Sequence, residues 1–467
     1  MSFLEFLGSE DWLSHCRSAD AQDAKLQAHG LPSGVTYLSQ LMGHDMFLTE
    51  PRKDTFIPNY KKHSDRTSVN MVERKLVLET VYGSGGSGDR RLYQESNRNK
   101  FDLLPHTFQQ QTVFSLKFLR DPRRKWSYPN LADNRNFSSP ILSHMVLAFM
   151  IYHNHLIDWI AAHGTNEQQK NPFSVARAIV ILTWHKIIRN DVLEKCAMPK
   201  ERAEEALGRP QGPEWEALVK KLLEDEETLA RDVLRSFHSL PKSSYKFNRD
   251  SFDFRIANVL KKKNRGPEIP GGFSNDLTEE QSKNLVLWQR QWQPDWTFFF
   301  DAVPGEHTAK NRTGFTPSFS FMHTDGHEKQ QIQTVDAKRE KLEEYRGLVA
   351  QFGIRETVMQ FWKDVTEVKG SEPDISPLDL PWSVLALVEA QYAPGKAPED
   401  FGKLGPLGSI ALRLQMNKIL RAADSLMRRI LSADGLTQAV RGGHAPDIPS
   451  TFMEMIESMK HPTSRWN

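Results

Sequence analysis

Two apolar stretches decide the fold: DNRNFSSPILSHMVLAFMIYHNHLIDWI at residues 133–160 and PFSVARAIVILTWHKIIRNDVLEKC at residues 172–196. In the first, a serine can cap a helix just before Pro140, and a first helical turn tolerates proline. Almost every residue at 141–152 and at 175–188 is apolar, which is typical of helices that are buried on most sides. The two stretches therefore predict a pair of long core helices in a mainly α protein.

The composition is that of an ordinary soluble protein that is large enough to bury a core. The chain has 467 residues and a formal net charge of +2, which favours no polyanionic partner such as nucleic acid. Cys16 and Cys196 are the only cysteines, so no disulfide framework is indicated. The N-terminus lacks the basic and apolar regions of a signal peptide. No uninterrupted apolar run reaches the roughly 18–20 residues of a membrane span. The sequence predicts a cytoplasmic protein without a membrane span.

The chain is expected to form one helical domain at residues 37–467 after an N-terminal extension at residues 1–36. No internal repeat and no long linker divides it, and Trp292, Trp296 and the run Phe298–Phe300 are expected in the core. Apolar residues at helical spacing indicate several further helices. Helices are expected within 200–235, 251–261, 335–368 and 409–432, and a short hairpin within 112–132.

Histidine and arginine near buried stretches are the informative residue types. His44 lies beside Asp45 in the apolar segment at 37–48, and Arg135 opens the first core stretch. A histidine near an arginine can move a proton while the arginine stabilises developing negative charge. Gln40 lies four residues before His44, so on a helix the two share one face. The alternative stays open, because a lone buried histidine is more often a hydrogen-bonded core residue.

Other motifs indicate no metal site. His323 and His327 lie in a polar, glycine-containing segment that is typical of an exposed turn, and no third ligand is obvious. HExxH, CxxC, Walker-type and GxSxG motifs are absent. His153, His155 and His185, at the polar ends of the core helices, are expected to be hydrogen-bonded core or helix-end residues.

Eight stretches together resemble the animal-type haem peroxidase (peroxidase–cyclooxygenase) superfamily, particularly its bacterial members, and they occur in the same order as in that family. They are LSQLMGHDMFLT, ETVYGSG, the two core stretches, FDFRIANVL, PDWTFFFDA, KLGPLGSIALRLQMNKILRAADS and PSTFMEMIE, and they cover about residues 37–456. The resemblance implies a large, single-domain, haem-peroxidase-like helical fold with little β structure and a haem between a distal and a proximal side.

The resemblance also implies roles for three residues. His44 is the distal histidine that exchanges a proton with hydrogen peroxide, and Arg135 is the cation that assists cleavage of the O–O bond. Gln40 hydrogen-bonds in the distal pocket. The implied function is a haem-peroxidase-like oxidoreductase that acts on a small organic substrate with peroxide or dioxygen.

The proximal side departs from the family pattern. Asn258 stands where the family has its axial histidine, three residues after Arg255, and neutral asparagine is a poor iron ligand. These two positions are the cofactor-binding residues that the resemblance implies, and His238 is an alternative ligand. Asp45 remains from the family's calcium site, but Val77 stands where an acidic residue is expected, so no calcium is predicted.

Two classes of function therefore stay open. One is the haem-peroxidase-like oxidoreductase. The other is a haem-free descendant, either a binding or partner protein, or an enzyme that uses the old distal pocket for non-redox acid–base chemistry. The sequence determines neither the substrate nor the oligomeric state.

Overall fold

The structure is a computed structural model of the whole chain. It describes parts of residues 6–15 and, with shorter gaps, residues 20–255, 293–316, 354–371, 382–433 and 448–460. The described chain is mainly helical, which confirms the predicted fold class.

The two predicted core helices form the centre of the molecule and pack against each other. The first begins at Pro140, not at Asp133, and a short turn, η2 (Asn134–Phe137), precedes it. Ser139 Oγ caps it by accepting from the Leu142 N–H at 3.2 Å. The second core helix continues through one π-helical turn into a short α-helical end. These elements are α6 (Pro140–His163), α7 (Asn166–Lys170), α8 (Pro172–Ile187), η3 (Ile188–Leu193) and α9 (Glu194–Cys196).

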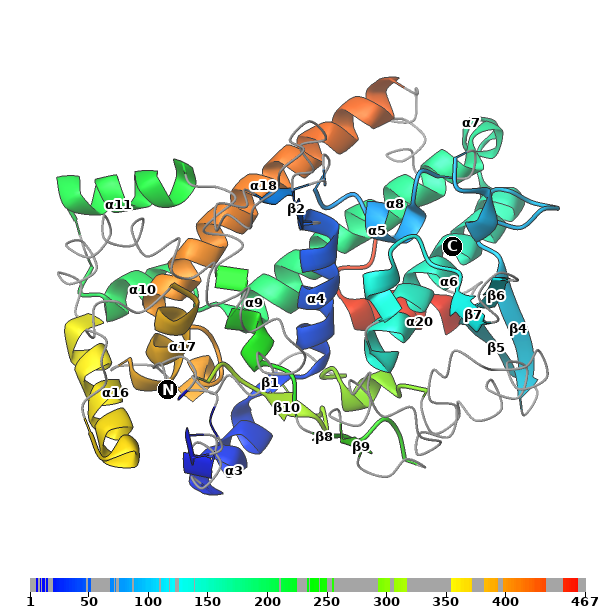
Figure 1. Ribbon diagram of the computed structural model, residues 1–467. Coiled ribbons are helices and arrows are strands. Elements are labelled where there is room, and N and C mark those ends of the chain that lie inside the picture. Colours follow the sequence, from blue (N-terminus) through cyan, green and yellow to red (C-terminus); the bar gives the residue numbers. More distant parts are fainter. Residues whose placement is uncertain are drawn as a thin grey trace, which may run out of the picture.

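Most of the remaining helices lie to the left of α6 in Figure 1. Helix α4 (Gly34–Met46) crosses the middle of the molecule and packs against α6 and against the π turn. The long helix α18 (Pro406–Ala433) packs against α8, α10, α11 and α17. The other helices are α3 (Asp20–His29), α5 (Glu79–Tyr82), α10 (Lys200–Ala206), α11 (Pro213–Glu224), α16 (Ile354–Lys369), α17 (Trp382–Tyr392) and α20 (Phe452–Lys460). Shorter 3-10 turns are η1 (Arg90–Leu92), η4 (Ser236–Ser239), η6 (Trp296–Phe298) and η8 (Pro398–Asp400).

The β structure of the described residues consists of two-stranded antiparallel ladders. The pairs are β1 (Leu31–Pro32) with β10 (Arg312–Thr313), β2 (Thr49–Pro51) with β3 (Ser68–Asn70), β4 (Leu103–Phe108) with β5 (Gln111–Leu116), β6 (Phe118–Asp121) with β7 (Trp126–Pro129), and β8 (Ser244–Tyr245) with β9 (Phe254–Arg255). The hairpin expected within 112–132 is β6–β7, since Asp121 pairs with Trp126.

The helix expected at 251–261 is wrong at Phe254 and Arg255. These two residues form β9, in which Phe254 pairs with Tyr245 and Arg255 with Ser244. Backbone groups that bond to a neighbouring strand cannot also form the bonds of a helix. The rest of that segment lies outside the described residues.

One large apolar core runs through the described chain, as expected of a single domain. Its members include Phe6 and Trp12 near the N-terminus and Phe452 and Met455 near the C-terminus. Phe298–Phe300 are buried as predicted, whereas Trp292 lies outside the described residues. The expected domain start at residue 37 falls inside α4, because that helix already begins at Gly34.

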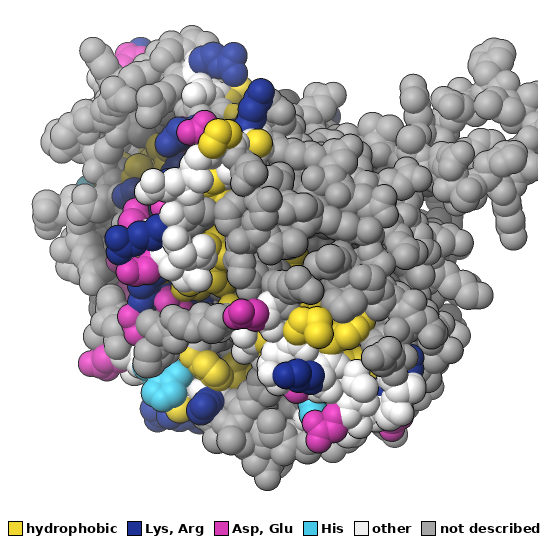
Figure 2. Space-filling view, turned by 90° about the vertical axis from the view of Figure 1, so that its left-hand side faces the viewer, with side chains coloured by type: hydrophobic (Ala, Val, Ile, Leu, Met, Phe, Trp, Pro, Cys, Tyr) yellow, Lys and Arg dark blue, Asp and Glu magenta, His cyan; other side chains and the backbone are white. Residues whose placement is uncertain are grey.

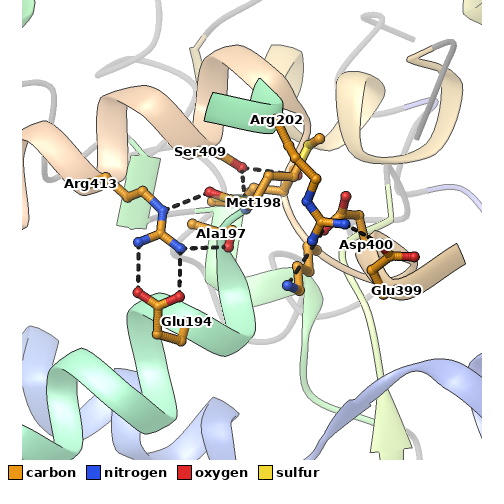
Figure 3. Close-up of polar contacts among 10 residues, drawn as sticks. Glu194, Ala197, Met198, Arg202, Glu399, Asp400, Ser409 and Arg413 are labelled. Atoms are coloured by element: carbon orange, nitrogen blue, oxygen red, sulfur yellow. Dashed lines mark hydrogen bonds and ion pairs between the residues drawn. The ribbon is translucent and has the colours of Figure 1, made fainter. Parts of the chain in front are cut away.

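A polar clamp joins the end of α9 to α18 (Figure 3). Arg413 donates from Nε to the Met198 carbonyl at 2.6 Å and from Nη2 to the Ala197 carbonyl at 3.1 Å. The same guanidinium binds the Glu194 carboxylate through both of its terminal nitrogens. Ser409 Oγ accepts from the Met198 N–H at 3.0 Å. Carbonyls at a helix end need outside donors, and α18 supplies them here.

By length and composition, α6 meets the test for a membrane-spanning helix, but 67% of its apolar window is buried inside the protein. A buried core helix of a folded protein meets the same test. The predicted lack of a membrane span and the predicted cytoplasmic location stay predictions.

Candidate functional site

His44 lies in the last turn of α4 and is half-buried. Its Nδ1 is 2.8 Å from Oδ1 of Asn136, a fully buried residue of η2. The Asn136 amide has one possible orientation, because its Nδ2 donates to both the carbonyl and the hydroxyl of Thr80, each at 3.0 Å. Its Oδ1 therefore faces the histidine and accepts from Nδ1–H, and in a neutral imidazole the lone pair is then on Nε2.

The contacts continue into a closed ring of hydrogen bonds. The Thr80 hydroxyl donates to Asp133 Oδ2 at 3.1 Å. Asp133 accepts from Nε of Arg135 at 3.0 Å and from its Nη2 at 2.6 Å. Nη2 of Arg135 also donates to the backbone carbonyl of His44 at 2.9 Å. The ring thus begins at the imidazole of His44 and returns to the backbone of the same residue, which holds α4, α5 and η2 together.

Arg135 is beside His44, as predicted, but its donors point into the protein. Besides Asp133 and the His44 carbonyl, it binds the Phe47 carbonyl through Nη1 at 2.5 Å. Both carbonyls lie at the C-terminal end of α4, where helical carbonyls need outside donors. Four of the five guanidinium N–H groups are engaged in these contacts. In this arrangement, Arg135 caps α4 and positions His44.

Burial and charge keep His44 neutral. Burial lowers the pKa of His44, the hydrogen bond with Asn136 opposes that shift, and the charge of Arg135 adds to it. For Asp133, burial opposes ionisation, but the hydrogen bonds from Arg135 outweigh it and the pKa of the carboxyl is lowered. The site therefore combines a charged Asp133–Arg135 pair with an uncharged imidazole of fixed tautomer. Such an imidazole can accept a proton at Nε2 near neutral pH.

Asp45, the neighbour of His44, points into the core instead. Its Oδ2 accepts from the Leu78 N–H at 3.0 Å and from Nε1 of Trp184 at 3.1 Å. Its Oδ1 is buried and has no hydrogen-bond partner among the described residues. Burial raises the pKa of Asp45 to about 7. The carboxyl thereby ties α4 to α5 and α8.

These surroundings do not fit a calcium ion. Calcium takes six to eight oxygen ligands, and the partners of Asp45 Oδ2 are N–H donors. Across the described part of the chain, no three histidine, cysteine or carboxylate residues are grouped to hold a metal. The absence of calcium stays a prediction.

The other predicted site residues are brought together only in part. Gln40 lies on α4 one turn before His44 and is half-buried. The backbone of Arg255 lies in β9, its side chain is not described, and Asn258 lies outside the described residues, as do His323 and His327. His238 lies in η4 and is exposed.

The residues present do not fit a haem that is held and activated in the manner of the resembled family. By that resemblance, an asparagine, Asn258, stands at the position of the axial ligand. On the distal side, the guanidinium of Arg135 binds a carboxylate and two backbone carbonyls. His44 has a defined tautomer, whereas Arg135 is used to hold the end of α4.

Two of the three histidines at the helix ends are hydrogen-bonded as expected, whereas Nε2 of the half-buried His155 has no hydrogen-bond partner among the described residues. His153 is buried, accepts from the Tyr82 hydroxyl at Nδ1 (3.0 Å) and donates from Nε2 to the Asn99 carbonyl (2.8 Å). His185 is also buried and lies between Oδ1 of Asp424 and the Leu76 carbonyl, each at 2.8 Å. These contacts support a structural role for both residues.

Sequence reasoning missed Asn136, Thr80 and Asp133. A local signal existed, because two of them flank the predicted Arg135 in the segment DNRN. Their contact with His44 had no such signal, since 92 positions separate Asn136 from the histidine.

No protein-family model matches the sequence, and no curated protein matches it. The resemblance to animal-type haem peroxidases depends on the stretches quoted above and stays a prediction.

Proposed function

We propose that the protein is an enzyme in which His44 is the general acid–base for a small organic substrate. One observation carries the proposal: Asn136 and Thr80 fix the tautomer of His44, so that the lone pair is on Nε2. A substrate O–H or C–H placed at Nε2 gives its proton to the imidazole, and Asn136 Oδ1 continues to accept from Nδ1–H. The nearby Arg135 charge disfavours the imidazolium, which favours return of the proton to the product.

Haem-free proton transfer is the reaction that we favour. One observation supports it: Arg135 is engaged with Asp133 and two backbone carbonyls. The resemblance adds that Asn258 stands at the axial position. Proton transfer at Nε2 of His44 needs neither a free arginine side chain nor an axial histidine.

A haem-peroxidase-like oxidoreductase that uses peroxide or dioxygen is the second candidate. The observation that favours it is the pairing of His44 with Arg135 through the His44 carbonyl at 2.9 Å, which matches the distal pair that the resemblance implies. Gln40, one turn away on α4, belongs to the same candidate. If the protein catalyses neither proton transfer nor oxidation, we infer a binding or partner protein without catalytic activity.

The partner that we propose is a small molecule and not a nucleic acid. On the face shown in Figure 2, described basic and acidic side chains are interspersed without a broad field of one sign. A nucleic-acid-binding face usually carries a continuous basic stripe.

The first experiment is an absorption spectrum with an iron assay on protein from cells that are supplied with a haem precursor. The haem-free proposal expects no Soret band, no iron and no uptake of added haem. A Soret band with near-stoichiometric iron would overturn it in favour of the oxidoreductase, and Asn258→His and His238→Ala would then locate the axial ligand.

The second experiment measures His44 directly by ¹⁵N NMR, with His44→Gln to assign its signals and His163→Gln as the control, since His163 is exposed on α6. We expect the Nδ1–H tautomer at neutral pH and a pKa below the usual value. A doubly protonated or Nε2–H imidazole at pH 7 would rule out His44 as the base.

A further inference from the structure

A cavity of about 320 Å³ lies at the other end of α4 from His44. It is lined by residues of α3, β8, η6 and the segment that leads into β10, which come together in the lower part of Figure 1. The lining residues are Gln27, Lys242, Ser244, Lys246, Phe298, Lys310 and Asn311. The N–H of Gly34, the first residue of α4, donates to the carbonyl of Phe299, next to the lining residue Phe298, at 2.8 Å. Ten residues of helix separate Gly34 from His44, about 15 Å at the usual rise.

The lining of this cavity carries positive charge and no negative charge. Three of its seven lining residues are lysines and none is acidic, although the whole chain has 61 basic and 59 acidic residues. Lys246 and Lys310 are exposed, and neither forms an ion pair with another described residue. The charges of Lys246 and Lys310 repel each other, and a bound anion relieves that repulsion.

The walls of the cavity are built from rigid parts. Asn311 is buried, accepts from the Lys246 N–H at Oδ1 (3.0 Å) and donates from Nδ2 to the Lys246 carbonyl (2.8 Å). The same Nδ2 also contacts the Phe298 carbonyl at 3.2 Å, and the Lys242 N–H donates to the hydroxyl of buried Tyr245 at 2.8 Å. The backbones of Lys242 and Lys246 are therefore fixed before any ligand binds, which lowers the entropic cost of binding.

We propose that this cavity binds a small phosphate-bearing molecule. Lysine ammonium groups bind phosphate as point charges, and the side chains of Ser244 and Gln27 supply polar groups around them. Phe298 provides an apolar wall for an organic portion. The volume is at the lower end for ligand sites, roughly 300–1,000 Å³, which suits a phosphate ester of a small metabolite better than a dinucleotide. The site is independent of the function proposed for His44.

The test is isothermal titration calorimetry of the full chain with pyrophosphate. We expect saturable one-site binding that weakens when the ionic strength is raised from about 0.05 M to about 0.5 M. Lys246→Gln/Lys310→Gln is expected to raise the Kd at least about tenfold. Both lysines are exposed, so the double variant should fold, and Lys310→Glu is the second variant, with a loss of similar or larger size.

The matched control is Lys170→Gln/Lys363→Gln, which removes the same charge from exposed positions on α7 and α16. It is expected to change the Kd by less than about twofold, because exposed charges beyond a Debye length are screened. No saturable binding by the wild type, or an equal loss in both double variants, would overturn the proposal. Succinate binding as tightly as pyrophosphate would overturn the assignment to phosphate.

Lipid headgroups also carry phosphate, and a second experiment distinguishes a soluble phosphate ligand from a lipid headgroup. Phosphatidylcholine vesicles that contain phosphatidic acid are expected not to co-sediment with the protein, because three lysines at about 1 kcal/mol each bind an anionic membrane only weakly. Co-sedimentation that is lost in Lys246→Gln/Lys310→Gln would contradict a soluble ligand.

Discussion

Asn136 determines the chemistry of His44 through the orientation of one buried amide. Without it, nothing described in the structure would hold the Nδ1–H tautomer. In Asn136→Ala, we expect a mixture of His44 tautomers by ¹⁵N NMR. We also expect a loss of about 1–3 kcal/mol in the free energy of unfolding, because the Thr80 carbonyl and the imidazole lose their partners.

The control for this change is Asn154→Ala. Asn154 also binds backbone with both ends of its amide, accepting from the Phe101 N–H at 2.7 Å and donating to the Phe101 carbonyl at 3.0 Å. Its loss should destabilise the fold to a similar degree and leave the tautomer of His44 unchanged. Equal effects of the two variants on His44 would contradict a specific role for Asn136.

Asp45 gives a residue-scale prediction about pH. Burial raises its pKa from 3.8 to about 7, so between these values the folded state binds a proton that the unfolded state does not. Stability from this group is full below about pH 4 and is lost as the pH rises to about 7. Asp45→Asn removes the titration, so its free energy of unfolding relative to the wild type should rise between pH 5 and pH 8. Urea denaturation at the two pH values measures this change, and a constant difference would refute it.

Two glycines test packing at the scale of elements. A Cβ on Gly405 would lie 2.2 Å from Cβ of Glu389, where α17 closely approaches the start of α18. The Glu389 carboxylate also caps α18, accepting from the Leu407 and Gly408 N–H groups at 3.1 and 3.0 Å. Gly405→Ala must push the two helices apart, and we expect it to cost about 1–3 kcal/mol of stability.

Gly43 is the opposite case and serves as the comparison. It lies inside α4, and a Cβ there would meet nothing within 4 Å. Alanine forms helices better than glycine, so Gly43→Ala should stabilise the protein by about 0.5–1 kcal/mol. Thermal unfolding of both variants should give shifts of opposite sign. An unchanged or higher melting temperature of Gly405→Ala would show that the approach of α17 to α18 is not set by Gly405.

At the scale of the whole molecule, buried and half-buried histidines contribute to the way in which the stability of the fold responds to acid. Burial lowers the pKa of His44, His144 and His155, and lowers that of His153 to about 4. Each is neutral in the fold and protonates first in the unfolded chain, so its contribution is lost as the pH falls below about 6.5. Asp45 acts in the opposite direction, as does Asp191, whose pKa burial raises to about 7.

Between pH 7 and pH 5 the two carboxyls add stability to the fold and the histidines remove it. We therefore expect the change in urea midpoint from pH 7 to pH 5 to be more negative in Asp45→Asn than in the wild type, because that variant lacks one of the stabilising carboxyls. An equal change in the two proteins would contradict the prediction.

The sequence by itself determined the helices and the apolar core. The cap at Ser139, the proline at the start of α6 and the apolar runs of α6 and α8 act within a few residues, so local chemistry suffices to specify them. It also singled out His44 and Arg135, because both are polar residues at the ends of buried segments. The prediction for 251–261 was wrong at β9 because pairing with β8 overrode helical spacing.

Only the tertiary structure decided what those residues can do. The tautomer of His44 depends on Asn136, 92 positions away, and the donors of Arg135 are directed by carbonyls 88 and 91 positions away. The lysines of the cavity come together because β8 and the segment before β10 meet at Asn311. Hydrogen-bond geometry between distant side chains leaves no periodic trace in a sequence, because it depends on how helices and loops pack.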